Sequence, residues 1–186
     1  MDDEAARPVS VMASVGYFIA QNRYDGVSAM PWYFGDAMLY RVSVDMAFGP
    51  GTFGVAGSLA SVPLQRDNSP TSNGEIQLRQ VMAVFRSPEP RQLGQVVEIG
   101  LGLSQYANYS GTDVVTGEDA KPRNAVAFSL GYGFAIPLGE RWGITLMQDY
   151  VTAIGSREGL PAGAKRSQEQ YTTRLGLRWR VLGARN

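Results

Sequence analysis

The 186-residue chain is long enough for one domain that closes a sizeable sheet. Its seventeen acidic and seventeen basic side chains balance, so no overall field favours nucleic acid as a partner. Histidine and cysteine are both absent, which excludes disulfides, thiolate nucleophiles, histidine bases and the commonest zinc ligands.

Glycines, prolines and aromatic residues are frequent, which indicates strands joined by turns. No run of eighteen uncharged apolar residues occurs, so no transmembrane helix is predicted. Period-two alternation between turn residues predicts eight strands. In chain order they run Val9–Ala20, Ala37–Phe48, Thr52–Leu64, Glu75–Arg86, Leu93–Tyr106, Asn124–Ile136, Arg141–Ile154 and Gln170–Leu182.

The predicted strands are about ten to fourteen residues long. A strand of an ordinary globular protein has about five or six residues, whereas a tilted strand that crosses a bilayer needs about nine to eleven. The connections after the second, fourth and sixth strands are short, and the other connections are long and polar. With antiparallel neighbours, all short turns then lie at one end and all long loops at the other, as in membrane barrels.

The last strand shows how the two faces differ. From Arg174 to Leu182 it reads RLGLRWRVL, so large apolar side chains alternate with arginine or glycine. Other strands likewise place charged or very small residues opposite their apolar face. Such a face would make a poor dry core, but it fits a narrow lumen in which opposite charges pair and glycines make room. The apolar face would then meet lipid.

Aromatic residues on the predicted lipid face fall into two groups, as expected for girdles at the two membrane interfaces. The group toward the short turns contains Phe48, Phe53, Phe134, Trp142 and Trp179. The group toward the long loops contains Tyr17, Tyr40, Tyr109, Tyr150 and Tyr171. The alternative, ordinary strand propensity, would scatter these rings along each strand.

The whole chain resembles the small eight-stranded outer-membrane β-barrels of the OmpA and OmpX type. Its last strand adds a specific feature, because the spacing of Arg174, Gly176, Trp179 and Val181 resembles the β-signal that the outer-membrane assembly machinery recognises. In many members of the family the aromatic residue is terminal, whereas here further residues follow it.

The resemblance implies an all-β, antiparallel up-and-down transmembrane barrel in a bacterial outer membrane, with short periplasmic turns and long extracellular loops. It implies a single domain over residues 1–186, with periplasmic tails at 1–8 and 183–186, in a mature form whose signal peptide has been removed. Lipopolysaccharide or other lipid would surround the barrel. No activity follows, because the same barrel serves many functions.

The inward charged residues form the sharpest candidate site. If the first strand rises from the periplasm, the outer half of the lumen holds Arg41, Arg79, Asp149 and Arg174, and the lower half holds Asp45, Glu98 and Arg178. Asp149 and Arg174 are expected to pair, since they lie on neighbouring strands at matching heights. We interpret the set as a salt-bridge network that plugs the lumen. The alternative is a narrow pore for ions or small solutes.

The long loops are the remaining candidates. The first loop is rich in aromatic residues, namely Tyr24, Trp32, Tyr33 and Phe34, which could anchor a protein partner, fold over the barrel mouth or sit in the outer leaflet. The acidic residues Asp113, Glu118 and Asp119 are interpreted as a solvated surface rather than a metal or catalytic site.

No cofactor, metal site or enzymatic activity is predicted. The expected function is structural, adhesive or binding through the loops. A second alternative is a soluble, lipocalin-like ligand-binding barrel, in which Leu175 and Trp179 would face inward.

Overall fold

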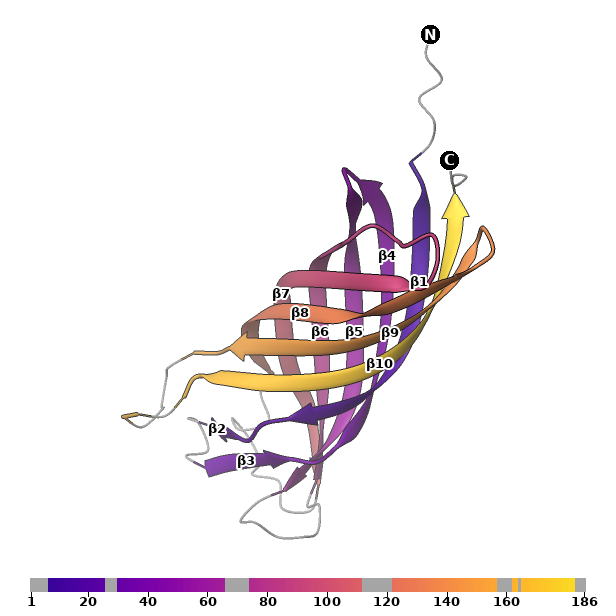
Figure 1. Ribbon diagram of the computed structural model, residues 1–186. Coiled ribbons are helices and arrows are strands. Elements are labelled where there is room, and N and C mark those ends of the chain that lie inside the picture. Colours follow the sequence, from indigo (N-terminus) through magenta and orange to yellow (C-terminus); the bar gives the residue numbers. More distant parts are fainter. Residues whose placement is uncertain are drawn as a thin grey trace.

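The computed structural model describes residues 7–25, 30–65, 74–111, 122–156, 162–163 and 165–182. Within this part of the chain, eight long antiparallel strands close into a barrel (Figure 1). They are β1 (Val9–Ala20), β4 (Ala37–Phe48), β5 (Gly51–Gln65), β6 (Gly74–Arg86), β7 (Gly94–Gly111), β8 (Arg123–Leu138), β9 (Trp142–Ile154) and β10 (Ser167–Leu182). The predicted fold class is confirmed. None of the described residues forms a helix long and apolar enough to cross a membrane.

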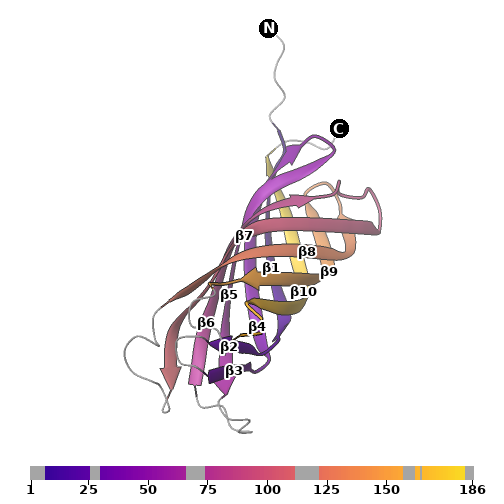
Figure 2. The same ribbon diagram turned by 90° about the vertical axis from the view of Figure 1, so that its left-hand side faces the viewer.

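The predicted strands are all present, and most differ from the prediction at their ends. The largest difference is in β7, which continues to Gly111 where Tyr106 was the predicted end. Two short strands, β2 (Arg23–Asp25) and β3 (Met30–Phe34), were not predicted. They pair with each other, and β3 pairs with the end of β5 (Figure 2). The tails predicted at 1–8 and 183–186 lie mostly outside the described residues.

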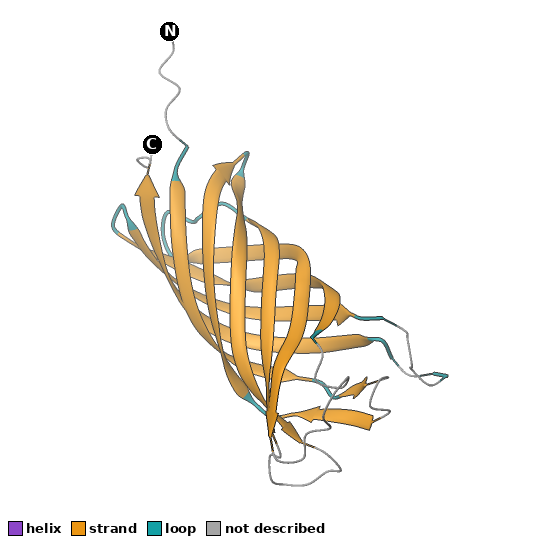
Figure 3. Cartoon of the chain, turned by 180° about the vertical axis from the view of Figure 1, so that it is seen from behind, coloured by secondary structure: helices purple, strands orange, loops and turns teal. Residues whose placement is uncertain are grey.

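The barrel is strongly sheared. Starting at Val11 of β1, the residue pairings lead once around the barrel and arrive at Gln21, directly after the end of β1 and ten residues beyond Val11. Such a stagger tilts the strands, and the tilt is visible as the slanted strands of Figure 3. A closed barrel of eight strands encloses only enough room for its own side chains.

The short turns, the start of β1 and the end of β10 share one end of the barrel (Figure 1). Gly49 and Gly139 lie in these turns with φ of 55° and 73°, a left-handed conformation that glycine adopts without steric cost. The strand ends that the long connections join lie at the opposite end. The predicted segregation of short and long connections is therefore confirmed.

Most of the outer wall of the barrel is an apolar surface. Leu175 is 55% exposed and Trp179 is 42% exposed, and the same strand face carries Leu177 and Val181. The soluble lipocalin-like alternative required Leu175 and Trp179 to face inward, so the structure contradicts it. An exposed apolar belt of this extent is stable only against lipid.

Near the long-loop end the inner face of the barrel becomes apolar and its outer face becomes polar. On β6 the inward residues Ile76 and Leu78 are buried, while Glu75, Gln77 and Arg79 point outward. Outward polar and inward apolar side chains are the arrangement of a water-exposed barrel. The strands thus continue beyond the apolar belt, and the outer half of the lumen is a dry core.

Candidate functional site

Six charged side chains form one cluster inside the barrel, which we call the charge cluster. Its members are Arg41, Asp45, Arg86, Glu98, Asp149 and Arg174, all of them buried. Glu98 lies at the centre, because its carboxylate contacts all three arginines. Arg41 Nη2 lies 2.6 Å from Glu98 Oε1, Arg174 Nη2 lies 3.2 Å from Oε2, and Arg86 Nε also donates to Oε2.

The other two carboxylates complete the cluster. Arg174 donates to both oxygens of Asp149, the pairing expected from the sequence, with 3.2 Å between Nη2 and Oδ1. Arg86 donates to Asp45 and to the Ser43 hydroxyl. Three positive and three negative charges therefore balance in a region without access to bulk water.

Arg86 was missed in the sequence analysis. It follows Phe85, whose ring faces outward opposite Phe53 of the lower aromatic girdle. Because neighbouring residues of a strand point to opposite faces, an outward Phe85 requires an inward Arg86. The pattern of the lower aromatic girdle could therefore have placed Arg86 in the lumen.

Arg79 corrects the prediction for the same strand. It was expected in the lumen, but it is exposed and pairs across the sheet with Leu59 and Gln105, which also face outward. The inward positions next to Arg79 are instead occupied by Leu78 and Gln80, and Leu78 belongs to the dry outer core. The expected outer and lower groups of charges are not separate, because Arg41 and Arg174 both contact Glu98.

Glycines leave the space that the cluster needs. A Cβ atom on Gly131 would lie 2.5 Å from Asp149 Oδ1 and 3.4 Å from the Glu98 Cβ. A Cβ on Gly16 would lie 2.9 Å from the Cβ of Arg174. The inward glycines predicted to make room for long charged side chains therefore stand next to them.

A layer of neutral hydrogen bonds lies beyond the charge cluster. Gln80 Nε2 donates to Gln170 Oε1 at 2.7 Å, and Gln170 Nε2 donates to the Tyr106 hydroxyl at 3.0 Å. The Tyr106 hydroxyl in turn donates to Gln168. All four side chains are buried, so this layer closes the lumen with satisfied polar groups.

The outer end of the lumen is filled by an apolar plug. Its buried members are Phe18, Ala20, Trp32, Ala37, Leu39, Ala60, Val62, Leu64, Ile76, Leu78 and Tyr106. Trp32 comes from β3 and is only 6% exposed. Phe34 stacks on Tyr106 with ring centroids 5.4 Å apart, and Arg123 lies 5.5 Å from the Trp32 ring. The aromatic first loop thus folds into the barrel mouth.

Tyr109 belongs to this plug rather than to the upper girdle. It is half-buried and lies 6.3 Å from Trp32. The reason is a β-bulge in β7, where the register with β6 shifts between Glu75 and Gln77 and Asn108 takes a φ of 52°. A bulge reverses the face of every later residue, so the expected lipid contact of Tyr109 is wrong. The other nine girdle residues point outward.

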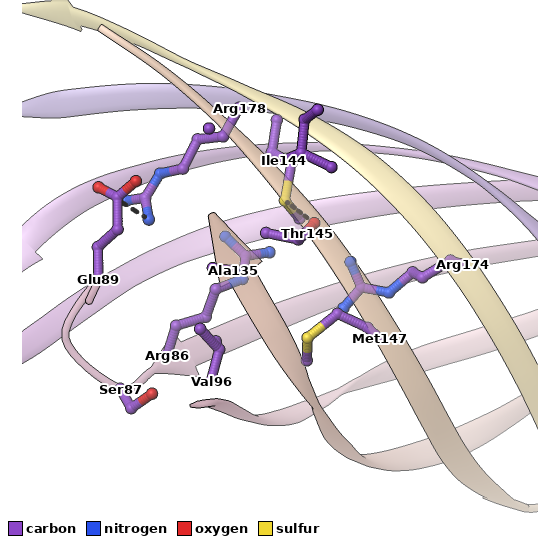
Figure 4. A pocket seen from close by; sticks show the side chains of 12 residues that line it. Arg86, Ser87, Glu89, Val96, Ala135, Ile144, Thr145, Met147, Arg174 and Arg178 are labelled. Atoms are coloured by element: carbon purple, nitrogen blue, oxygen red, sulfur yellow. Dashed lines mark hydrogen bonds and ion pairs between the residues drawn. The ribbon is translucent and has the colours of Figure 1, made fainter. Parts of the chain in front are cut away.

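The short-turn end is closed by the connection between β6 and β7. Glu89 of this turn lies 2.8 Å from Arg180 Nη2 and 3.7 Å from Arg178 Nη1, and Arg178 also donates to Ser10 Oγ at 2.9 Å. Figure 4 shows Glu89 and Arg178 facing each other, joined by a dashed line, among the residues that line a small cavity. Its free volume is about 10 Å³, roughly the space that one water needs.

The predicted assembly signal lies on both faces of β10. Arg174 and Gly176 point inward, while Trp179 and Val181 point outward, and Trp179 stacks on Trp142 with centroids 5.9 Å apart. The acidic residues Asp113, Glu118 and Asp119, and the side chain of Tyr24, lie outside the described part of the chain.

Solved structures that share this fold include a surface protein, an attachment protein and an outer membrane protein. Neisserial surface protein A aligns with a TM-score of 0.65 and 11% identity, over 93% of this chain and 97% of that chain. Ail, the attachment invasion locus protein of Yersinia pestis, gives 0.54 and 14%, over 95% and 99%. The outer membrane protein AlkL gives 0.53 and 12%, over 100% and 96%. At these identities the likeness establishes the fold.

No protein-family model and no curated protein matches the sequence. The fold is therefore recognised from the arrangement of the strands, and the function must be argued from the lumen and the surface.

Proposed function

We propose that this chain, which has the fold of the small outer-membrane β-barrels, is an integral outer-membrane protein with a closed lumen. Its role is structural, or is carried by its long-loop end, and is neither conduction nor catalysis. The apolar outer wall and the likeness to outer-membrane proteins support the location. The β-signal pattern of β10 supports insertion by the outer-membrane assembly machinery.

The observation that carries the proposal is the closure of the lumen in successive layers. The Glu89 turn, the charge cluster, the glutamine and tyrosine layer and the apolar plug follow one another along the axis. A conducting path needs continuous water or polar groups that exchange partners with the ion. The apolar plug offers neither, so a permeating ion would have to cross dry hydrocarbon and aromatic groups.

The test is conductance of the purified full-length protein in planar bilayers. We expect no steady single-channel current, and no current after neutralising either member of the Asp149 and Arg174 pair separately by Asp149→Asn or Arg174→Gln. Correct folding of each variant is checked by its heat-modifiable migration in gels. Steady currents from the unaltered protein, changed by either substitution, would establish the narrow pore instead.

A binding role is tested at the long loops. Ail was solved with the heparin analogue sucrose octasulfate, so sulfated glycans are a reasonable first probe for this chain. We expect the full-length barrel to retain binding to host-type glycans or proteins only while its long loops are intact. Binding that survives replacement of all four long loops by short turns would contradict a loop-carried role.

A further inference from the structure

A row of polar side chains crosses the outer wall of β6, β7 and β8. Arg79 pairs with Gln105, and Gln105 pairs with Asn124, so the three residues stand side by side and all face outward. Gln105 Nε2 donates to Asn124 Oδ1 at 2.8 Å, and Arg79 Nη2 donates to Gln77 Oε1 at 2.8 Å. These contacts link the row to Gln77, two residues further along β6.

The β-bulge in β7 adds a fifth member. Asn108, with its φ of 52°, is exposed, and its Nδ2 donates to Gln77 Oε1 at 2.7 Å. A bulge is a local device that re-aims a side chain, and here it adds a second amide next to Gln77. We call Gln77, Arg79, Gln105, Asn108 and Asn124 the amide patch. Four neutral amides surround one cation.

Arg79 is the charged group of the patch. In the described part of the chain no carboxylate lies within ion-pair distance of it. The nearest acid along β6 is Glu75, and its carboxylate accepts a hydrogen bond of 3.0 Å from Ser61 of β5, on the side away from β7. The patch therefore presents unneutralised positive charge together with amide donors and acceptors.

Directly below the patch lies lipid-facing surface. The next row toward the short turns is Val81, Leu103 and Val126, and the row after that is Ala83, Leu101 and Phe128. Ala83 is much smaller than its neighbours and lies at the floor of a groove of about 450 Å³, which Phe53, Phe85, Ile99, Leu101 and Phe128 surround. Ala83 lies four positions from Arg79, or about 13 Å along the strand.

We propose that this sector binds one class of amphiphile, the phosphorylated glycolipid of the outer leaflet. Its phosphate pairs with Arg79, its sugar hydroxyls bond with the amides, and one acyl chain lies in the Ala83 groove. Arginine matches the geometry of a phosphate, and neutral amides both donate to and accept from hydroxyl groups. The amide patch lies toward the long loops and the Ala83 groove lies toward the membrane centre, which is the order of head group and acyl chain in a lipid of the outer leaflet. The inference rests on the proposed location in the outer membrane.

The opposite side of the barrel provides an internal comparison. Another groove of about 480 Å³ lies around Ala13 on β1, between Val15, Ile144, Leu175 and Leu177. The polar pair near it is Gln148 and Thr173, joined by a hydrogen bond of 2.6 Å, and it carries no charge. This groove can accommodate an acyl chain but offers no partner for a phosphate.

The experiment is native mass spectrometry of the full-length barrel in detergent micelles that contain one lipid probe at a time. The probes are lipid A, the same lipid with its phosphates removed, and phosphatidylglycerol. The variants are Arg79→Gln and Ala83→Leu, which change the proposed site. Their matched controls are Arg91→Gln, an exposed arginine of the short-turn end, and Ala13→Leu, which fills the other groove. Heat-modifiable migration confirms that each variant is folded.

We expect one lipid A to remain bound to the unaltered protein and to both controls. Arg79→Gln and Ala83→Leu should each weaken binding about tenfold or more, and removal of the phosphates should abolish the effect of Arg79→Gln. Equal binding by all variants, or equal loss in Ala13→Leu and Ala83→Leu, would overturn the site. If phosphatidylglycerol bound as tightly as lipid A and its binding also depended on Arg79, the proposal that the ligand is a glycolipid would be overturned. The conductance test of the closed lumen is independent of each of these outcomes.

Discussion

Glu98 shows how single residues hold the interior together. It is only 1% exposed, and its two oxygens form ion pairs with Arg41, Arg86 and Arg174, which come from three different strands. A buried charge is costly unless its partners neutralise it, and in this cluster every charge has an opposite partner. Removal of the central carboxylate would leave three buried guanidinium groups with two carboxylates.

The first prediction follows from this imbalance. Glu98→Gln should lower the free energy of unfolding by about 3–5 kcal/mol, because it leaves uncompensated positive charge in a dry lumen. The measurement is a urea titration of the protein in lipid vesicles, followed by tryptophan fluorescence. As a control, Glu75→Gln at an exposed site should change the free energy of unfolding by no more than about 0.5 kcal/mol. Similar losses in the two variants would show that the cluster does not stabilise the barrel.

A residue-level prediction from the sequence succeeded on two strands whose alternation is regular. Asp149 and Arg174 could be paired because β9 and β10 have simple alternation. Arg79 and Arg86 could not be separated by charge alone, since one faces out and the other faces in on the same strand. The outward face of this strand changes from polar at Arg79 to apolar at Val81, and alternation carries no information about that change.

At the scale of the strands, close backbone approach sets the register. Gly102 of β7 faces inward, and a Cβ atom there would overlap the Val81 carbonyl oxygen of β6. Gly57 of β5 faces outward, and nothing lies within 4 Å of the corresponding Cβ position. The two glycines occur in similar strand sequences, yet only one of them is required by its surroundings.

A second prediction separates them. Gly102→Ala should lower the free energy of unfolding by about 1–3 kcal/mol, because β6 and β7 must move apart to relieve the overlap. Gly57→Ala should leave the free energy of unfolding unchanged or raise it by about 0.4–1 kcal/mol, since a less flexible unfolded chain favours folding. Urea midpoints in the same vesicles provide the comparison. A stable Gly102→Ala variant would mean that the two strands are not held at this distance.

The long strands were predictable because each has enough residues to show its period and several are followed by glycine, as β4 is by Gly49 and β8 is by Gly139. Strands β2 and β3 are three and five residues long, and β3 contains Pro31, so neither shows a period. Their position depends on the packing of Trp32 in the barrel mouth, which is a tertiary contact. The bulge in β7 was hidden for the same reason, and Tyr109 was therefore placed on the wrong face.

The whole molecule combines two opposite arrangements in one sheet. In the membrane belt, apolar side chains face out and the charge cluster fills the axis. Toward the long loops, polar side chains face out and an apolar plug fills the axis. The second arrangement gives the barrel a water-exposed end with its own dry core, which closes the lumen above the charges.

The three tryptophans test the whole account, because they sample both sides of the wall. Trp142 and Trp179 are exposed on the outer wall, whereas Trp32 is buried in the apolar plug. The measurement is fluorescence quenching by brominated phospholipids in vesicles, using three proteins that each keep one tryptophan and carry Trp→Phe at the other two positions. We predict strong quenching of Trp142 and Trp179 and almost none of Trp32. Strong quenching of Trp32, or protection of Trp142 and Trp179, would contradict a barrel whose apolar wall faces lipid.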